Sequence, residues 1–448
     1  MSGGLMQLVA YGQQDLILTG NPQITFFKLV HKRHTNFSVQ STEQVFNGTA
    51  GFNRKVTCTI SRTGDLVAGM ILQIELPHLQ NWRASLGMSE KEFPHISQVA
   101  WVNSIGHAII QSISIEIGGQ KIDEHYGTWL EIWDELTTKS EKRAGYNQMI
   151  GKYASDIGLR NNALSARTYY IPLQFWFCQN PGLALPLIAL QFHEVKVNVQ
   201  FRPLTECIVA LDAAGDRVTG NNMSIKPVQD TQYQFTTCSL WVDYIYLDVE
   251  ERKRFAAMKH DYLITQLQYA GSEAISGFTG STNKLRINFN HPVKELIFTL
   301  QHQDNITAGL KNNDWFNFSS NVPGSRNPTY SRDLLYRAQL KLNGHDRFDV
   351  RPASYFRLVQ PYQCHTCIPS KHIYVYSFAL RPEEHQPSGA CNFSRIDVAS
   401  LEYSTTPPDR LPGGRAVWAS KSGQIDLYAL NYNVLQVRNG LAGTSYAN

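Results

Sequence analysis

The residues of this 448-residue chain with the greatest capacity for chemistry are two closely spaced cysteines, Cys364 and Cys367, with His365 between them. A Cys-x-x-Cys spacing can supply half of a zinc site or form a redox disulfide. A closed zinc site needs four ligands, and the sequence offers no second such pair; His372 is the only further candidate nearby. We interpret the two cysteines as loop residues without a shared role, with metal binding or pairing as the alternative.

Two histidine-bearing clusters also invite a functional reading. The run 31–34 (His-Lys-Arg-His) could touch phosphate, but it follows a strand-like segment, Ile24–Leu29, and an exposed basic turn is the favoured interpretation. His193 and Glu194 directly precede an alternating strand pattern that begins at Val195. A hydrogen-bonded pair at a sheet edge is therefore favoured over an acid/base role.

Motifs of the common enzyme classes are missing from the sequence. It has no nucleophile elbow, no P-loop, no Gly-rich dinucleotide fingerprint, and no His-x-His run with a following Glu as in cupins. We predict no catalytic, cofactor-binding or metal-binding residues, and a protein that is not an enzyme. Six Asn-x-Ser/Thr sequons occur; if glycans are present, Asn305 and Asn317 in a long polar loop are the expected carriers.

Composition limits the class of protein further. The 41 basic and 37 acidic residues leave a net charge of only +4, too little for a protein whose main task is to coat nucleic acid. We see no signal peptide at the N-terminus, and prolines interrupt the most apolar window, residues 171–190, so no transmembrane span is expected. Seven scattered cysteines indicate free, mostly buried thiols in a reducing compartment.

The elements that must position these residues repeat once along the chain. Apolar and polar residues alternate over 113–117 before Gly118-Gly119, and again over 338–342 before Asn343-Gly344. Both dipeptides suit the positive φ angles of a tight hairpin. Three further pairs of segments fall in the same order: 64–74 with 291–300, 170–201 with 374–403, and 241–248 with 425–437.

The repeat predicts two copies of one all-β domain, of sandwich or jelly-roll type. We place an N-terminal arm at 1–23, the first domain at 24–250, a charged linker or short helix at 251–260 and the second domain at 261–448. Residues 129–150 have the pattern of a helical excursion between two strands of the first domain. Residues 271–283 and 305–332 are expected to be long surface loops of the second domain.

Several segments resemble the major capsid proteins of nucleocytoplasmic large DNA viruses, the phycodnavirus and iridovirus group. They are GLMQLVAYG at 4–12, LTGNPQITFFK at 18–28, RHTNF at 33–37, PGLALPLIAL at 181–190, WVDYI at 241–245, YSFAL at 376–380, QPSG at 386–389, CNFSRID at 391–397, NYNVL at 431–435 and SYAN at 445–448. The segments cover the chain from end to end, and the departures lie mainly in the long loops and at residues 383–385.

The resemblance implies a double jelly roll: two tandem eight-stranded jelly-roll β-sandwiches with short helical insertions. It also implies a major capsid protein that forms a homotrimeric, pseudo-hexameric capsomer of an icosahedral shell. The expected partners are other copies of the chain, neighbouring capsomers, penton and minor capsid proteins, and the side of an internal membrane through the arm. Direct nucleic-acid binding is not expected. The expected location is the virion, after assembly in the host cytoplasm.

Two alternatives remain at this point. One is a scaffold that shapes the assembling virion and is then lost. The other is an extracellular carbohydrate-binding or glycan-hydrolysing double jelly-roll protein, which predicts a signal peptide and paired carboxylates in a cleft, neither of which is evident in the sequence.

Overall fold

The computed structural model of the chain describes residues 2–79, 96–154, 164–213, 217–218, 233–307, 312–321, 331–411, 418 and 421–446. The chain divides into two units, Met1–Phe37 and Ser38–Asn448. The first unit holds three short helices, α1 (Gly3–Val9), η1 (Gln13–Asp15) and α2 (Leu16–Thr19). The strand expected at Ile24–Leu29 is wrong, because these residues are irregular and exposed and have no neighbouring strand to pair with.

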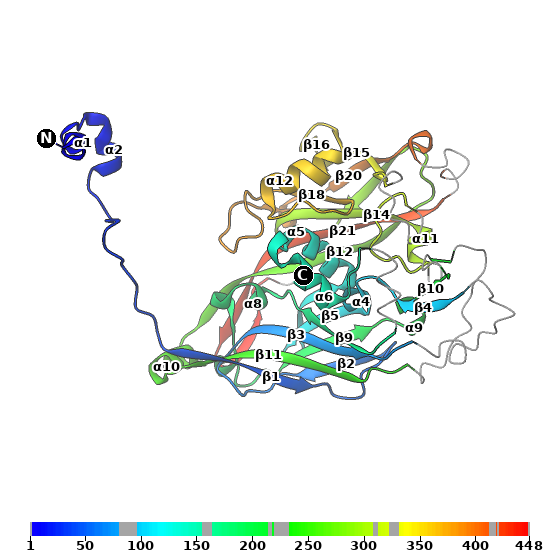
Figure 1. The fold of residues 1–448 in the computed structure, drawn as a ribbon, viewed down its shortest axis with the longest axis horizontal. Coiled ribbons are helices and arrows are strands. Elements are labelled where there is room, and N and C mark those ends of the chain that lie inside the picture. Colours follow the sequence, from blue (N-terminus) through cyan, green and yellow to red (C-terminus); the bar gives the residue numbers. More distant parts are fainter. Residues whose placement is uncertain are drawn as a thin grey trace. The chain divides into compact units, whose positions relative to one another are not determined.

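The second unit begins with a sandwich of two antiparallel sheets (Figure 1). One sheet has the order β1-β11-β3-β7 with β8 paired to β3, and the other has the order β2-β9-β5-β6. The strands are β1 (Phe37–Val45), β2 (Lys55–Thr59), β3 (Leu66–Leu76), β5 (Ile110–Ile117), β6 (Gln120–Tyr126), β7 (Arg167–Pro172), β8 (Leu185–Pro186), β9 (Val195–Phe201) and β11 (Thr237–Leu247), with β4 (Gln98–Trp101) and β10 (Ile208–Leu211) as a separate pair.

A second sandwich follows with the same plan. Its sheets have the orders β12-β21-β14-β18 and β13-β20-β15-β16, with β17, β19 and β22 as short additions. The strands are β12 (His260–Ile275), β13 (Thr282–Ile287), β14 (Pro292–His302), β15 (Leu335–Leu342), β16 (His345–Asp346), β17 (Arg351–Pro352), β18 (Ile373–Ser377), β19 (Cys391–Asn392), β20 (Ala399–Thr405), β21 (Gly423–Arg438) and β22 (Leu441–Thr444).

The predicted duplication is confirmed by the strand pairing. When the strands of each sandwich are counted in chain order, the two sandwiches have the same strand order across both sheets. Strand β3 of the first sandwich therefore corresponds to β14 of the second, and β11 to β21. A bulge interrupts both of these pairs at the same position, opposite Gly69 in one and at Glu295 in the other. Four strands in each of two sheets make each half an eight-stranded jelly roll, as expected.

Both predicted hairpins are confirmed. Ile117 pairs with Gln120 around Gly118-Gly119, and Leu342 pairs with His345 around Asn343-Gly344. All four turn residues have positive φ, at 58° and 82° in the first turn and 50° and 82° in the second. The turn residues read from the sequence therefore set the register of both hairpins.

The helical excursion of the first sandwich is also confirmed, as α5 (Gly127–Thr137) and α6 (Ser140–Ile150) between β6 and β7. The charged junction forms an exposed helix, α10 (Val249–Ala257). The remaining helices are short: α4 (Ile105–Ala108), α8 (Trp176–Gln179), η2 (Pro181–Leu183), η3 (Leu187–Ala189), α9 (Leu204–Cys207), α11 (Gln303–Ile306), η4 (Tyr355–Val359), α12 (Gln360–Cys364), η5 (Phe393–Arg395) and η6 (Pro408–Arg410). None of the described helices is long and apolar enough to span a bilayer.

Two predicted loops need correction. Residues 271–283 are mostly strand, because β12 passes through a bulge after Tyr269, with Gly271 at a φ of 86°, and continues to pair with β21 as far as Ile275. Of the expected surface loop 305–332, the described residues 312–321 are largely buried rather than exposed. Residues 308–311 and 322–330 of that loop lie outside the described part of the chain.

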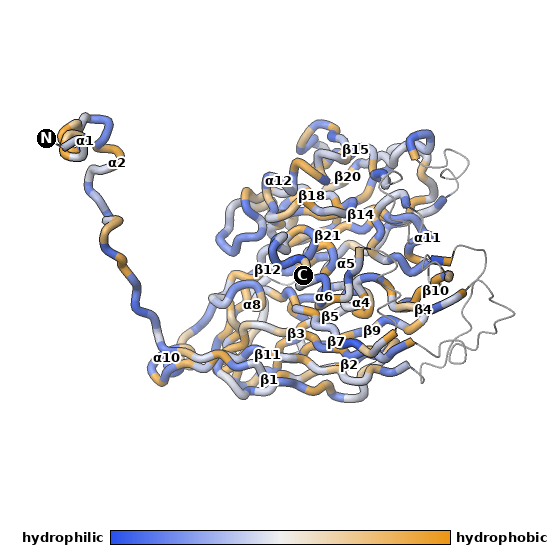
Figure 2. The backbone as a smooth tube through the Cα atoms, in the orientation of Figure 1, coloured by the Kyte–Doolittle hydropathy of each residue, from blue (hydrophilic) through white to orange (hydrophobic). Residues whose placement is uncertain are grey.

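Each sandwich buries its own core between its two sheets. The first core includes Ile113, Ile115 and Ile117 with the inward residues of β9, and the second includes Phe298 and Tyr374. In Figure 2 apolar and polar residues are mixed along the strands of both sandwiches. Strands β14 and β21 are nearly continuously buried, so something covers the outer face of their sheet as well.

The first hairpin generates a matched test of turn geometry. A Cβ on Gly118 would lie 2.4 Å from the His193 ring, whereas a Cβ on Gly119 would meet nothing within 4 Å. Both substitutions incur about 1 kcal/mol from positive φ, and we expect Gly118→Ala to cost roughly 1–3 kcal/mol more from the clash. Denaturant unfolding of the two variants measures the difference, and equal midpoints would contradict the described approach of His193.

Candidate functional site: the seam between the sandwiches

Helix α5 covers the outer face of the second sandwich and joins the two halves of the unit. Its residues Trp129, Ile132, Trp133 and Leu136 have the i, i+3, i+4, i+7 spacing of one helix face. They form a cluster, here called the seam, with residues of β14, β18 and β21: Ile297, Ile373, Val375, Tyr428 and Leu430. The rings of Trp129 and Tyr428 lie 5.6 Å apart. The packing of α5 explains why the β12-β21-β14-β18 sheet is buried on both faces.

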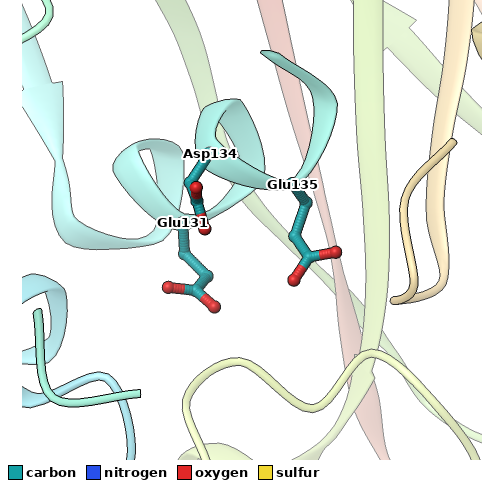
Figure 3. Close-up of side chains that lie close together, drawn as sticks. All are labelled: Glu131, Asp134 and Glu135. Atoms are coloured by element: carbon teal, nitrogen blue, oxygen red, sulfur yellow. The ribbon is translucent and has the colours of Figure 1, made fainter. Parts of the chain in front are cut away.

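The polar side of the same helix carries three buried carboxylates. Figure 3 shows Glu131, Asp134 and Glu135 leaving α5 close together, and their ligand oxygens lie within 4.8 Å of one another. The ammonium group of Lys152, just beyond α6, lies 2.9, 3.0 and 2.7 Å from oxygens of the three. From the second sandwich, Lys371 forms an ion pair with Glu131. The carboxylates therefore form an ionic cluster that includes a side chain from each sandwich.

Further hydrogen bonds fix this cluster. His107 Nδ1 lies 2.7 Å from Glu131 Oε2. The backbone N–H and the hydroxyl of Ser370 both donate to Glu135 Oε2, at 2.9 and 2.8 Å. The backbone N–H of Cys367 donates to the carbonyl of Leu136 at 2.9 Å. Because residues 367–371 belong to the second sandwich, the hydrogen bonds of Ser370 and Cys367, like the ion pair of Lys371, cross the seam.

The pKa values follow from this arrangement. Burial alone would raise the pKa of Glu131, but Lys152, Lys371 and the His107 hydrogen bond outweigh it and hold that pKa well below its ordinary value. The pKa of Glu135 is lowered in the same way, against the effect of burial. Burial likewise opposes the charge of Lys152, but the surrounding carboxylates raise the pKa of its ammonium group. Glu131, Glu135 and Lys152 are therefore charged at neutral pH.

Three clustered carboxylates are also a potential metal site, and the geometry bears on that reading. Hard cations such as Ca²⁺ and Mg²⁺ take carboxylate oxygens as ligands. Here the ammonium of Lys152 lies at hydrogen-bonding distance from all three acids, in the place that a cation would take. The donor set is therefore already neutralised by protein side chains and fits no metal in this arrangement.

A second buried charge cluster involves a residue of the Cys-x-x-Cys segment. His365 Nε2 lies 2.8 Å from Glu295 Oε2, and its Nδ1 lies 2.8 Å from Glu383 Oε1. Burial would lower the pKa of His365, but the two carboxylates outweigh burial and raise it to about 9. The protonated imidazole ties the loop around Glu383 to strand β14, and we call this contact the clasp.

The two cysteines of the Cys-x-x-Cys segment lie in different surroundings. Cys364 ends α12, while Cys367 lies at the seam with its thiol donating to the Thr138 carbonyl at 3.0 Å. All seven cysteines are free, as predicted, although only Cys58 and Cys207 are fully buried. The chemically active member of the segment is therefore His365, whose partners are 70 and 18 residues away and could not be read from local spacing.

The predicted glycan carriers lie in the same region. Asn305 is fully buried, and its Nδ2, the atom that a glycan would use, donates to the Asn317 carbonyl at 2.9 Å. Burial of that atom disfavours a sugar on the folded chain, and a glycan at Asn305 stays a prediction. Asn317 is half-buried, and its amide donates to Asp314 and to the Asn321 carbonyl; a glycan at Asn317 stays a prediction.

The segment that follows Asn305 packs against the first sandwich instead of facing outward. Asn313 Nδ2 donates to the carbonyls of Thr205 and Ile208, each at 2.8 Å. The indole N–H of Trp315 donates to the Glu206 carbonyl at 2.8 Å. These bonds add a second crossing between the sandwiches, and polar composition alone gave no sign of it.

The two other sequence candidates are not among the seam residues. Residues 31–34 of the first unit are exposed, as predicted, but they are irregular rather than a turn. His193 Nδ1 faces the backbone of Ala442 on β22, and Glu194 pairs with Lys196 at 3.1 Å. His193 is therefore hydrogen-bonded, as expected, but it precedes the central strand β9 and its partner is Ala442 rather than Glu194.

The seam predicts a large effect from removing one cation. Lys371→Met leaves the buried Glu131 with one fewer counter-charge, which we expect to lower the unfolding free energy by about 1–3 kcal/mol. Lys253→Met is the matched control, since Lys253 pairs with Glu250 on the surface, and it should change stability by less than about 0.5 kcal/mol. Guanidinium unfolding at one protein concentration tests this; similar losses in both variants would refute the seam's ionic role.

The clasp predicts a dependence on alkaline pH. The pKa of His365 is about 9 in the fold against an ordinary 6.5, so its stabilisation is complete below about pH 6.5 and disappears as pH rises through 9. The stability lost in His365→Gln should therefore shrink between pH 6.5 and 9.5. His345→Gln, at an exposed hairpin position, is the control. A loss that is constant over this range would show that the clasp does not depend on the imidazolium.

Two protein families match this chain, one over each of the two sandwiches. The family described as "Major capsid protein N-terminus" matches residues 25–248, and the family "Large eukaryotic DNA virus major capsid protein" matches residues 251–443. Proteins named major capsid protein from Pyramimonas orientalis virus and Phaeocystis pouchetii virus are 43% and 39% identical, with 100% of each chain covered in both alignments.

Solved structures show the same fold. PBCV-1 VP54 has a TM-score of 0.73 and 33% identity, covering 95% of this chain and 100% of that one. The Faustovirus major capsid protein has a TM-score of 0.71 at 14% identity, over 97% of this chain and 96% of that one, which supports the fold. From these matches over its whole length, the chain belongs to the major capsid proteins of large eukaryotic DNA viruses.

Proposed function

We propose that this chain is the building block of an icosahedral shell, as a homotrimeric capsomer with six similar sandwiches in a near-hexagonal ring. The observation that carries the proposal is the seam, which joins two equivalent sandwiches into one compact unit. Two similar domains per chain, taken three times, approximate a hexagon and need only three chains to close. Similarity to PBCV-1 VP54, whose related structure is titled a virus capsid, supports the same use.

The function is one of shape and self-association rather than turnover. The two buried polar clusters contain their own counter-charges, one at the seam between the sandwiches and one against strand β14, so they stabilise the block. The proposed location is the virion, with assembly in the host cytoplasm. The proposed partners are neighbouring capsomers and the penton and minor capsid proteins, and the small net charge of +4 argues against direct nucleic-acid binding.

The N-terminal unit is proposed to reach beneath the shell. It exposes many large apolar side chains that the unit itself does not bury: Leu5, Leu8, Val9, Ile17, Leu18, Phe26, Phe27 and Leu29. Exposed apolar clusters of this kind mark sites of contact with another protein or a membrane. We assign them to minor capsid proteins or the side of an internal membrane.

The trimer predicts a definite mass in solution. Light scattering of the purified full chain should give about three times the 50.7 kDa of one chain. The chain should also be the most abundant protein of purified mature particles, which separates a shell protein from a scaffold that is lost. A stable monomer, or absence from mature particles, would contradict the proposal.

The arm predicts a separation of folding from assembly. Deleting residues 2–20 should leave the trimer's mass and thermal midpoint unchanged, because these residues belong to a unit separate from the sandwiches. The yield or stability of assembled particles should fall, measured by sedimentation of particles from cells that express the full set of virion proteins. Normal particles from the deleted chain would count against a role for the arm.

A further inference from the structure

The seam suggests a role for the helical segment of the second sandwich that corresponds to α5. In the first sandwich, the segment between β6 and β7 forms α5, whose apolar face covers the outer face of the next sandwich. In the second sandwich the corresponding segment lies before β18 and forms the consecutive helical turns η4 and α12. Because the two sandwiches share one strand order, these segments hold equivalent places in the fold.

The face of this second helical segment is apolar and exposed. Leu358 and Val359 lie four and three residues before Tyr362, so each shares a side of the helix with Tyr362. Their side chains are 38%, 41% and 77% exposed. The corresponding apolar face of α5 packs against the second sandwich, and its residues Trp129 and Leu136 are almost completely buried. No described residue of the chain covers the face formed by 358, 359 and 362 to a similar degree.

The corresponding outer sheet face of the first sandwich is only partly covered by the described residues. The strand registers show which residues of this face correspond to the covered face of the second sandwich. In the first sandwich Ile71 pairs with Trp241 and Pro172. At the equivalent position of the second sandwich, Ile297 pairs with Tyr428 and Val375. By the same registers Tyr170 matches Ile373, and Asp243 matches Leu430.

The two matched faces differ in exposure. Ile297, Ile373, Val375, Tyr428 and Leu430 are all buried by the seam. Their counterparts Ile71, Pro172 and Trp241 are only partly buried, and Tyr170 is 41% exposed. The face nevertheless keeps large apolar side chains at these positions, as a surface that meets a partner does.

The two partly covered faces lie at opposite ends of the sandwich pair. Figure 1 shows the β1-β11-β3-β7 sheet at the lower edge of the second unit and α12 toward its upper edge. One chain therefore cannot bring them together, whereas a second copy placed head-to-tail can. Heterologous contacts of this kind close into a ring when the rotation between copies allows it.

We propose that the face formed by Leu358, Val359 and Tyr362 docks on the Ile71, Tyr170, Pro172 and Trp241 face of a neighbouring copy, repeating the seam between chains. The occupant of each face is thus a second copy of this chain, and this inference rests on the proposed trimer. The charges fit as well: Arg351 is exposed beside the helix, while Glu75 and Asp243 lie on the sheet face.

The test uses one charge on each face of the full chain and a matched control. Tyr362→Asp and Tyr170→Asp each place a carboxylate in the proposed contact, and should raise the dissociation constant of the contact by roughly 30-fold or more. Met258→Asp, at a residue 62% exposed on the end of α10, is the control and should leave association unchanged. Light scattering over a dilution series gives the mass, and thermal unfolding shows that each variant is folded.

The outcomes separate this inference from the proposed function. Folded monomers from both face variants, with wild type and Met258→Asp trimeric, support it. A trimeric wild type whose two face variants are also trimeric, with unchanged dissociation, overturns the inference and leaves the capsomer standing. A monomeric wild type overturns both. If Tyr362→Asp fails to fold, Tyr362→Ser and Tyr170→Ser replace the charges, and unchanged dissociation in these variants also overturns the inference.

Discussion

The rest of the structure depends on the packing of one short helix, α5, against the outer face of the second sandwich. Four large side chains of α5 become buried there, and each such burial contributes about 1.5–3 kcal/mol. Without this contact the sandwiches would still be joined by the linker helix α10, by the contacts of residues 312–321 and by hydrogen bonds between β6 and β12, such as that from the Leu267 N–H to Asp123 Oδ1. The apolar half supplies the attraction, and the ionic half fixes the position, since buried carboxylates are tolerated only where their counter-charges lie within reach.

This joint turns a duplicated fold into a single block. Each sandwich has its own core, and the seam adds a third cluster that belongs to neither alone. A shell protein needs such rigidity, because the angle between its two halves determines how copies meet. The same reasoning links the internal seam to the proposed contact between chains. The η4–α12 segment and the outer face of the β1-β11-β3-β7 sheet are the equivalents of the seam's two sides, and the described residues leave both partly exposed.

The fold and the family could be predicted from the sequence, but most contacts of the seam could not. Alternation and turn residues located both hairpins, and the helical excursion was found from its 3.6-residue period. The strand expected at Ile24–Leu29 failed because an apolar pattern alone does not supply a neighbouring strand. The loop predicted to be exposed around Asn313 is buried, because its amide satisfies carbonyls of the other sandwich, more than 100 residues away in the chain.

The sequence by itself determined the duplication, the turns and the all-β class, because these depend on periodicity and φ preferences that act between near neighbours. It also carried the family resemblance in segments spread along the chain. Only the tertiary structure decided which charges meet. Glu131 and Lys371 are 240 residues apart, and His365 joins Glu295 across 70. Such pairs are created by packing of sheets and helices, so they leave no spacing that a reader of the sequence could recognise.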